Sequence, residues 1–251
     1  MILEIFYYLK EKNIKKKLVE LSVILPCYNE CKNIPIIVER FSELINKNQS
    51  IEVIMVNNGS NDDSKKILNK LAKYNHFLKV INLKKNLGYG GGIHRGLIEA
   101  SGNILSYTHS DLQTNPNDIL RGYEILKKQK NENVFLKGLR LKRPLFDQFF
   151  TVGMSIFESL YLGKFLWDIN AQPNIFPKSL LSEIKEFPKD FSFDLFLFYI
   201  ARVRGYKVIR FNVDFPKRIH GQSSWNKGIK SKIKFIKRTI RFTIDLNKLI
   251  K

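Results

Sequence analysis

The first 140 residues alternate between short apolar runs and stretches in which apolar residues recur at helical intervals. Residues 21–26 and 51–56 are mostly apolar runs of strand length, typical of strands buried on both faces of a sheet. Between them, Ile37, Phe41 and Leu44 recur every three or four residues, which is the spacing of one helix face. Because such strand–helix units follow one another, the pattern predicts an α/β fold with a mainly parallel central sheet flanked by helices.

The expected elements of this first part alternate strictly. We expect strands at residues 21–26, 51–56, 78–83, 103–108 and 134–139, and helices at 34–45, 62–74, 92–100 and 116–128. Two helix starts carry capping residues, which are Asp62 or Ser64 for the second helix, and Asn115 followed by Pro116 for the fourth.

The second half of the chain has a less regular pattern. A helix is expected at 145–163, a turn-rich stretch at 167–176, an aromatic-rich helix at 191–204 ending at Gly205, and a strand at 207–213. Beyond residue 225, isoleucines recur with helical spacing among lysines and arginines. We therefore divide the chain into an amphipathic segment at 1–20, one domain at 21–225 and a basic amphipathic helix at 226–251.

The chain is strongly basic, with a formal net charge of +20 and a pI near 9.8. A composition rich in lysine, asparagine and isoleucine accounts for part of this charge, but the charge is also concentrated at the two ends. Such a surplus suits nucleic acid, an anionic membrane surface or a phosphorylated substrate. No basic element that reads nucleic acid is recognisable, so we expect no nucleic-acid partner.

Cysteine count and apolar run length bear on the cellular setting. Cys27 and Cys31 are too few for a disulfide framework, so we interpret them as reduced thiols of a cytosolic protein. The apolar stretch at 5–9 is short and is followed, not preceded, by lysines, unlike a secretory signal. No run of about 18 apolar residues occurs, so no transmembrane helix is expected.

Polar residues follow three of the expected strands, at 28–30, 57–60 and 109–113. In open α/β sheets, ligands bind beyond the carboxyl ends of the strands, so these segments together favour a site for a polar ligand. His109, Asp111 and Gln113 alternate along a segment that we expect to be extended, so their side chains can share one face. They could hold a divalent cation bridged to a diphosphate, or Asp111 could simply hydrogen-bond backbone before a helix.

Five short motifs resemble those of family 2 glycosyltransferases, in the same order. Residues 26–30 are similar to the family's P-x-Y-N-E motif, and residues 56–62 to its V-D-D-G-S-x-D element. Residues 86–92 resemble the N-x-G-x-G-G-A turn of the polyprenyl- and dolichyl-phosphate sugar synthases, and residues 109–116 resemble their D-x-D-L-Q-x-x-P segment. Residues 218–223 are similar to the family's R-x-x-G-x-S motif. The resemblance implies a single GT-A-like domain over residues 21–225.

The resemblance also implies a role for each matched residue. The nucleotide base and ribose would lie near Pro26, Tyr28, Glu30, Asn58 and Asp62, and the turn around Gly90 would let the backbone approach the donor or pack closely at a helix start. A Mg²⁺ or Mn²⁺ ion would bind to Asp111 and Gln113, with His109 as a third ligand or as a group that orients phosphate. Phosphates of the donor or acceptor would lie near Arg218 and Ser223, and the acceptor phosphate near Arg140.

Four positions depart from known patterns. Asn57 and Asn58 replace the family's pair of aspartates, which removes charge near the base. His109 replaces the first aspartate of D-x-D, so metal affinity would be lower and more dependent on pH. Ile93 stands where the third glycine of a dinucleotide fingerprint would be, which argues against a dehydrogenase.

The implied activity is an inverting transfer of a sugar from a nucleotide-sugar donor to a polyprenyl phosphate or a glycan, in the synthesis of cell-envelope glycans. A hydroxyl acceptor would need a general base, for which Asp194 is the candidate, although Asp194 could instead cap its helix. A phosphate acceptor is already anionic and needs no base. The alternative is an inactive family member that binds nucleotide sugars or a membrane surface.

Lysines beside the isoleucine stripe at 228–251 suit a helix that lies on an anionic cytoplasmic leaflet. The same pattern also suits a solvated basic helix packed on its own domain. We therefore expect a cytoplasmic protein that binds peripherally to the inner face of the cell membrane.

Overall fold

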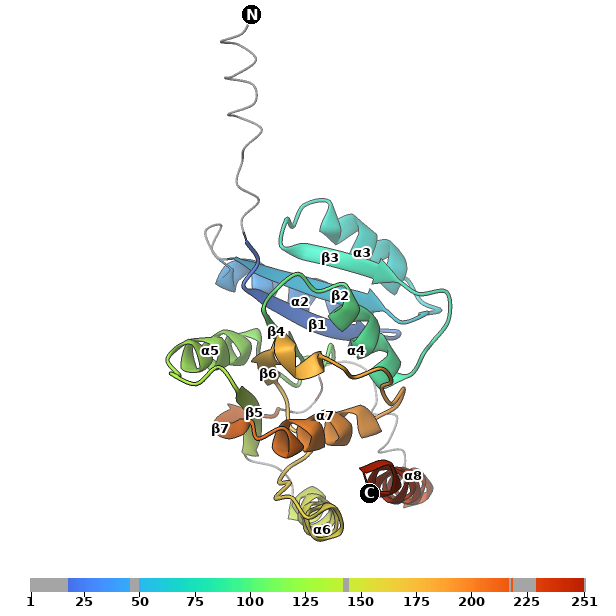
Figure 1. The fold of residues 1–251 in the computed structure, drawn as a ribbon. Helices are drawn as coiled ribbons and strands as arrows, with labels where there is room; N and C mark the ends of the chain where they lie inside the picture. The colour runs from blue at the N-terminus through green and yellow to red at the C-terminus, as the bar shows by residue number, and fades with distance from the viewer. Residues whose placement is uncertain (1–17, 46–49, 142–144, 217, 219–228, 251) are drawn as a thin grey trace, which may run out of the picture.

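A mixed sheet runs through the centre of the molecule (Figure 1). The computed structural model describes residues 18–45, 50–141, 145–216, 218 and 229–250. Within these residues the sheet has seven strands in the order β3-β2-β1-β4-β6-β5-β7. The strands are β1 (Leu21–Cys27), β2 (Ile51–Asn57), β3 (Leu78–Asn82), β4 (Ile104–Tyr107), β5 (Val134–Leu141), β6 (Asn174–Pro177) and β7 (Lys207–Asp214). All neighbouring pairs are parallel except those of β6, so the predicted α/β class with a mainly parallel sheet is confirmed.

Helices cover both faces of the sheet. They are α2 (Ile34–Leu44), α3 (Ser64–Ala72), α4 (Tyr89–Ile98), α5 (Pro116–Lys127), α6 (Leu145–Leu162), α7 (Ser192–Val203) and α8 (Ile229–Ile250), with a short 3-10 helix at Lys178–Leu181. One core cluster joins Phe41 of α2 and Leu68 of α3 to the sheet, and a second joins Leu97 of α4 and Phe198 of α7 to its other face. The alternating residues of β1 divide between the two clusters, as a strand buried on both faces requires.

The structure contains one strand that the sequence pattern did not predict. Residues 167–176 were expected to be turn-rich, but Asn174–Pro177 forms β6, which pairs antiparallel with β4 and β5. The strand has only four residues, with an asparagine and a proline at its ends, so its local pattern is weak. Its position between two established strands supplies the hydrogen bonds that make it a strand.

Both predicted helix caps have a side-chain hydrogen bond in the structure. Asn115 caps α5, because its side chain accepts a hydrogen bond from the backbone N–H of Asn117 at 3.0 Å and Pro116 follows. At α3, Asp62 accepts the backbone N–H of Ser64 at 3.0 Å, whereas Asp63, directly before the helix, makes no side-chain capping bond. The helix expected from residue 92 begins earlier, at Tyr89, directly after Gly88 with its positive φ of 82°.

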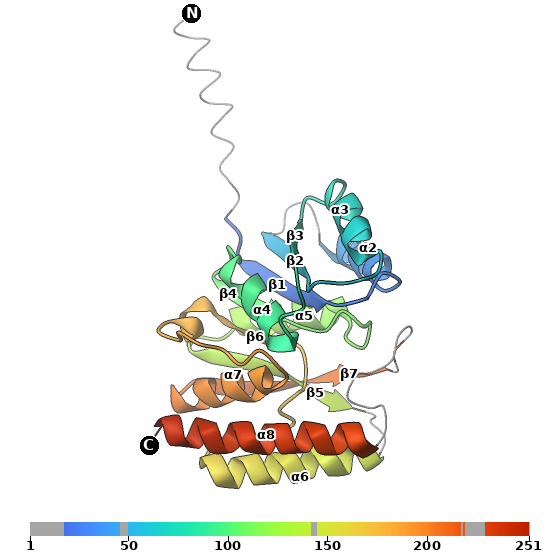
Figure 2. The ribbon, with the colours of Figure 1, turned by 90° about the vertical axis from the view of Figure 1, so that its right-hand side faces the viewer.

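Helices α6 and α8 lie side by side at the end of the molecule opposite β3 and α3 (Figure 2). Glu158 of α6 accepts a hydrogen bond of 2.5 Å from the hydroxyl of Thr243 on α8, and Arg238 of α8 pairs with Asp190 at 3.0 Å. The described part of the basic C-terminal segment thus packs on its own domain. The amphipathic segment expected at 1–20 falls largely outside the described residues. None of the helices in the described ranges combines the length and apolar character needed to cross a bilayer.

Burial of Glu158 between α6 and α8 makes the stability of the protein depend on pH. Desolvation raises the pKa of this carboxyl to about 7, opposed by the hydrogen bond from Thr243. The folded state therefore binds a proton that the unfolded state releases above pH 4.5, so stability falls as the pH rises from 5 to 7. We expect the free energy of unfolding of Glu158→Gln, measured relative to the wild type, to be about 2 kcal/mol higher at pH 8 than at pH 5.

Urea unfolding of both proteins at the two pH values measures how the stability difference between them changes with pH. The titration of other groups is the same in both proteins and cancels. Glu183→Gln, at an exposed glutamate outside the helix pair, serves as the matched control and should show no such change. An equal effect of Glu158→Gln at both pH values would contradict the assignment.

Candidate active site

The polar ends of β1, β2 and β4 meet at one edge of the sheet, because β1 pairs in parallel with both β2 and β4. This strand pairing brings together the loops that the sequence predicted to form a site. Ser60 accepts a hydrogen bond from the backbone N–H of Asn29, Ser64 accepts one from that of Glu30, and Asp62 accepts one from that of Cys31, all at 3.0–3.1 Å. These three hydrogen bonds thus connect the two loops that were proposed to surround the nucleotide base.

Residues of the P-x-Y-N-E match differ in their exposure. Tyr28 is 43% exposed, so its ring is available to a ligand. Pro26 accepts a hydrogen bond of 2.8 Å at its carbonyl from the hydroxyl of Ser110, which ties the first loop to the third. Burial and, to a smaller extent, the nearby Asp111 raise the pKa of Glu30 to about 7, against a hydrogen bond from Asn33. Glu30 and Asp111 therefore lie close enough to influence each other's charge.

The asparagines at 57 and 58 form hydrogen bonds that aspartates could not form. Asn58 donates from Nδ2 to the carbonyl of Gly88 at 2.8 Å and accepts at Oδ1 from the N–H of Leu87 at 2.9 Å. Asn57 donates to the side chain of Asn82 at 2.9 Å. A carboxylate has no donor, so these two contacts require an amide. The two asparagines thus remove the charge of the family's aspartates and, through their hydrogen bonds, position the glycine turn and β3.

The glycine turn packs against the segment before α7. A Cβ at Gly90 would lie 2.2 Å from the carbonyl oxygen of Pro188 and 2.8 Å from that of Asp190. The N–H of Gly91 donates to the carbonyl of Lys189 at 3.1 Å. Two roles were expected for these glycines, and the structure has one of them, which is close packing at a helix start. Approach of the backbone to a donor stays a prediction.

Asp111 and Gln113 both contact the cationic side chain of Arg218. Arg218 makes an ion pair of 2.7 Å from Nη2 to Oδ2 of Asp111 and donates from Nε to Oε1 of Gln113 at 3.0 Å. Asp111 is buried, and its other oxygen accepts the N–H of Gln113 at 3.1 Å. Two oxygen ligands therefore converge on a positive group that a polar ligand or a cation could replace. The sequence predicted all three residues but not their contact.

His109 lies near Tyr89 and Asp194. The expectation of an extended segment from 109 to 113 is wrong, because Leu112 has a φ of 63° and is buried in the core. The ring of His109 lies 5.6 Å from that of Tyr89, and its charge lowers the pKa of Asp194, which burial otherwise raises. Among the described residues, no three His, Cys, Asp or Glu side chains gather closely enough to hold a metal ion. A metal bound to Asp111 and Gln113 would complete its shell with phosphate oxygens and water, which suits Mg²⁺.

Asp194 is buried in the first turn of α7 and does not cap it. Its Oδ1 accepts hydrogen bonds from the hydroxyl of Tyr107 at 2.7 Å and from Nε2 of Gln172 at 3.1 Å. Burial raises the pKa of Asp194, against the opposing charge of Lys137, which is fully buried on β5 and whose own pKa burial lowers to about 7. Asp194 thus belongs to a buried polar network directly beneath the site.

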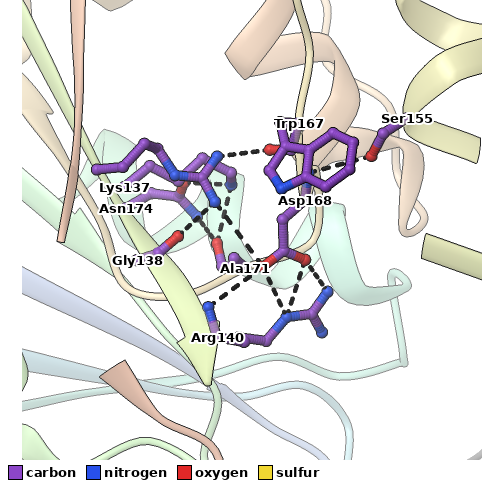
Figure 3. Close-up of polar contacts among 9 residues, drawn as sticks. Lys137, Gly138, Arg140, Ser155, Trp167, Asp168, Ala171 and Asn174 are labelled. Atoms are coloured by element: carbon purple, nitrogen blue, oxygen red, sulfur yellow. Dashed lines mark hydrogen bonds and ion pairs between the residues drawn. The ribbon is translucent and has the colours of Figure 1, made fainter. Parts of the chain in front are cut away.

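Arg140, at the end of β5, is held by Asp168 (Figure 3). The carboxylate of Asp168 accepts from Nε at 3.0 Å, from Nη2 and from the backbone N–H of Arg140. Arg210 of β7 lies 3.8 Å from the same carboxylate and donates to the carbonyl oxygens of Trp167 and Gly138 at 2.5 and 2.7 Å. Burial raises the pKa of Asp168, but Arg140 and Arg210 hold it below its usual range. Two arginines share one carboxylate, which leaves an excess of positive charge beside the site.

The sequence interpretation missed Lys137, Asp168, Arg210 and Tyr89. Lys137 and Arg210 interrupt apolar strand patterns, and a charged residue inside such a run is a signal of a buried polar contact. Asp168 and Tyr89 had no comparable local signal. Ser223, predicted to lie near phosphates, falls outside the described residues.

The order and pairing of the strands define a fold of the GT-A type. Similarity to solved structures supports this fold. Glucosyl-3-phosphoglycerate synthase from Mycobacterium tuberculosis, solved with Mn²⁺, UDP and glucosyl-3-phosphoglycerate, superposes with a TM-score of 0.69 at 17% identity, over 91% of this chain and 79% of that chain. A mannosyltransferase from Pyrobaculum calidifontis, solved with GDP-mannose and Mn²⁺, gives a TM-score of 0.61 at 22% identity, over 86% and 65%.

Residues 22–145 match the family described as Glycosyl transferase family 2, and the chain belongs to this family. An undecaprenyl-phosphate 4-deoxy-4-formamido-L-arabinose transferase from Yersinia enterocolitica is 30% identical over 135 residues, which cover 49% of this chain and 41% of that protein. An uncharacterized glycosyltransferase from Synechocystis is 28% identical over 216 residues, or 83% of this chain and 65% of that protein. The chain thus spans less than two thirds of the length of either relative.

Proposed function

We propose that this protein transfers a sugar from a nucleotide-diphosphate sugar to the phosphate of a polyprenyl lipid, with inversion at the anomeric carbon. The observation that carries this proposal is the convergence of Asp111, Gln113 and Arg218 at the sheet edge where the loops at 28–30 and 58–62 also meet. An acidic group, an amide oxygen and a guanidinium at one point are what a metal-bound diphosphate would contact.

Each part of this edge has a role in the proposed transfer. The loops that contain Tyr28 and Asp62 bind the nucleotide, and Tyr28 offers an exposed ring to the base. Asp111 and Gln113 would hold a Mg²⁺ or Mn²⁺ ion, which would supply positive charge against the leaving diphosphate. Arg218, freed from Asp111, stays within reach of the same phosphates and stabilises their charge by bidentate hydrogen bonds.

A phosphate acceptor is favoured over a hydroxyl acceptor by the environment of Asp194. This carboxylate is buried and engaged by Tyr107 and Gln172, so it is poorly placed to take a proton from a sugar hydroxyl. Arg140 and Arg210 instead offer positive charge next to the site, which suits a phosphate that already carries its nucleophilic oxygen. The Yersinia relative is named for a transfer to undecaprenyl phosphate, which supports the same acceptor class. The reaction would then serve the synthesis of cell-envelope glycans on the inner face of the membrane.

The test is a thermal-shift screen of UDP-, GDP- and other nucleotide sugars with and without Mn²⁺, followed by a transfer assay with undecaprenyl phosphate. A ligand at about 100 times its dissociation constant stabilises the folded state by about 2.7 kcal/mol, so one nucleotide class should raise the melting temperature, and only with the metal. EDTA should abolish the shift and the formation of a sugar lipid. Binding of a nucleotide sugar without transfer to any lipid phosphate or glycan would instead identify an inactive binding protein.

A further inference from the structure

The segment directly before α7 connects the C-terminal helix to the candidate active site. Helix α7 has α4 on one side and α8 on the other (Figure 1). Residues 188–191, where α7 begins, contact both the glycine turn at 86–92 and α8. A continuous series of contacts therefore runs from α8 to the site.

Arg238 makes the contact from α8. Its Nε forms an ion pair of 3.0 Å with Oδ2 of Asp190, and its guanidinium lies 5.6 Å from the centre of the Phe191 ring. The other carboxylate oxygen of Asp190 accepts the backbone N–H of Ser192 at 2.9 Å, in the first turn of α7. The two charged side chains are 37% and 39% exposed, so water weakens their attraction and the pair contributes little to the stability of the whole fold.

The same segment packs against the glycine turn without space for a side chain. The carbonyl oxygen of Lys189 accepts the N–H of Gly91 at 3.1 Å, and a Cβ at Gly88 would lie 2.2 Å from that oxygen. The ring of Phe191 stacks on the ring of Tyr89, with their centres 4.6 Å apart and their planes at 15°. Because these contacts are so close, the turn cannot keep its position when the segment moves.

The glycine turn also contacts the loops of the site. Asn58 donates to the carbonyl of Gly88 at 2.8 Å, which attaches the turn to the loop proposed to bind the nucleotide. The ring of Tyr89 lies 5.6 Å from that of His109, which stands two residues before Asp111. The turn therefore contacts both the proposed nucleotide loop and the segment proposed to hold the metal and the diphosphate.

We propose that Arg238 is a positioning residue, which holds the glycine turn in the conformation that binds the nucleotide diphosphate of the donor. It acts through Asp190 and Phe191 and does not itself contact the donor. A turn that is already ordered in the free protein loses less entropy on binding, so the affinity for the diphosphate is higher. The effect on the donor rests on the proposed function, whereas the coupling of α8 to the turn does not.

Hydrogen exchange of the folded protein tests this coupling without any substrate. In Arg238→Gln, the amides of residues 86–93 should exchange about three- to fivefold faster than in the wild type, which is the scale of losing one exposed ion pair. Arg241→Gln is the matched control, because Arg241 is an exposed arginine of the same helix, three residues further along. The control should leave exchange at 86–93 unchanged, and circular dichroism should show that both variants are folded.

Binding of UDP, GDP and ADP, each with Mn²⁺, tests the consequence for the donor. For the nucleotide that the wild type binds, Arg238→Gln should raise the dissociation constant about three- to fivefold, and Arg241→Gln should leave it unchanged. Arg238→Lys should restore part of the affinity, because an ammonium keeps the charge but lacks the planar group that can both pair with Asp190 and lie over Phe191.

The transfer assay separates positioning from a general structural defect. In Arg238→Gln, KM for the nucleotide sugar should rise together with the dissociation constant, while KM for the lipid phosphate stays the same. A structural defect would instead lower the melting temperature and kcat without this difference between the two substrates.

Unchanged exchange at 86–93 in Arg238→Gln would overturn the proposal, and so would an equal increase in Arg241→Gln. Faster exchange that leaves the dissociation constant of a bound nucleotide unchanged would overturn it as well. A wild type that binds none of the three nucleotides and transfers no sugar would overturn the proposed function alone, and the exchange result would still decide whether α8 holds the turn.

Discussion

Replacing Asp111 with asparagine is expected to lower kcat/KM for sugar transfer by about 10³-fold, which is the cost of losing one well-placed electrostatic group. Within the described part of the chain, Asp111 is the one formal negative charge among the residues that contact Arg218, so the amide cannot hold a divalent cation with comparable strength. The fold should survive, because an asparagine oxygen can still accept the N–H of Gln113. The measurement is initial-rate kinetics at saturating Mn²⁺ with the nucleotide sugar found by the screen.

Asp118→Asn is the matched control for this variant. Asp118 is also an aspartate of low exposure, but it lies in the first turn of α5 and pairs with Arg121 at 2.8 Å. It should retain near wild-type activity. If Asp111→Asn keeps its activity and its response to EDTA, the metal does not bind at Asp111.

Replacing Asp168 with asparagine is expected to lower the free energy of unfolding by about 3 to 4 kcal/mol, as is usual when one partner of a buried ion pair is removed. The side chains of Asp168, Arg140 and Arg210 are only 6%, 9% and 20% exposed, so the two guanidinium groups would lose their countercharge in a poorly solvated place. Urea unfolding followed by tryptophan fluorescence measures the change. Asp63→Asn, at an exposed aspartate, should change the stability by less than about 0.5 kcal/mol.

The contribution of Asp168 should also depend on pH. The pKa of its carboxyl in the folded state is below its usual value, so the contribution is present above about pH 4 and is lost as the pH falls through the folded-state pKa. The difference in stability between wild type and Asp168→Asn should therefore shrink in strong acid. A difference that stays constant down to pH 2 would show that the ion pair is not its source. In the transfer assay, the same variant should raise KM for the lipid phosphate more than for the nucleotide sugar, because it disorders Arg140.

The sequence predicted the doubly covered sheet because five of its strands are apolar runs that alternate with amphipathic helices. It also predicted the polar strand ends at 28–30, 57–60 and 109–113, since carboxyl ends of adjacent parallel strands share one edge. It could not predict β6, whose four residues become a strand only between β4 and β5. Nor could it predict that Leu112, with its positive φ, turns the segment away from an extended path.

Local pattern thus determined the elements, their alternation and the identity of the polar residues at one edge of the sheet. Contacts between distant segments were decided by the tertiary structure, because hydrogen bonds and ion pairs across more than 25 residues leave no periodic signal. Asn58 holds the glycine turn, Arg218 joins Asp111 to Gln113 across more than 100 residues, and Asp168 fixes Arg140. The basic pattern at 226–251 was visible in the sequence, but only packing decided that α8 lies along α6 and that Arg238 pairs with Asp190.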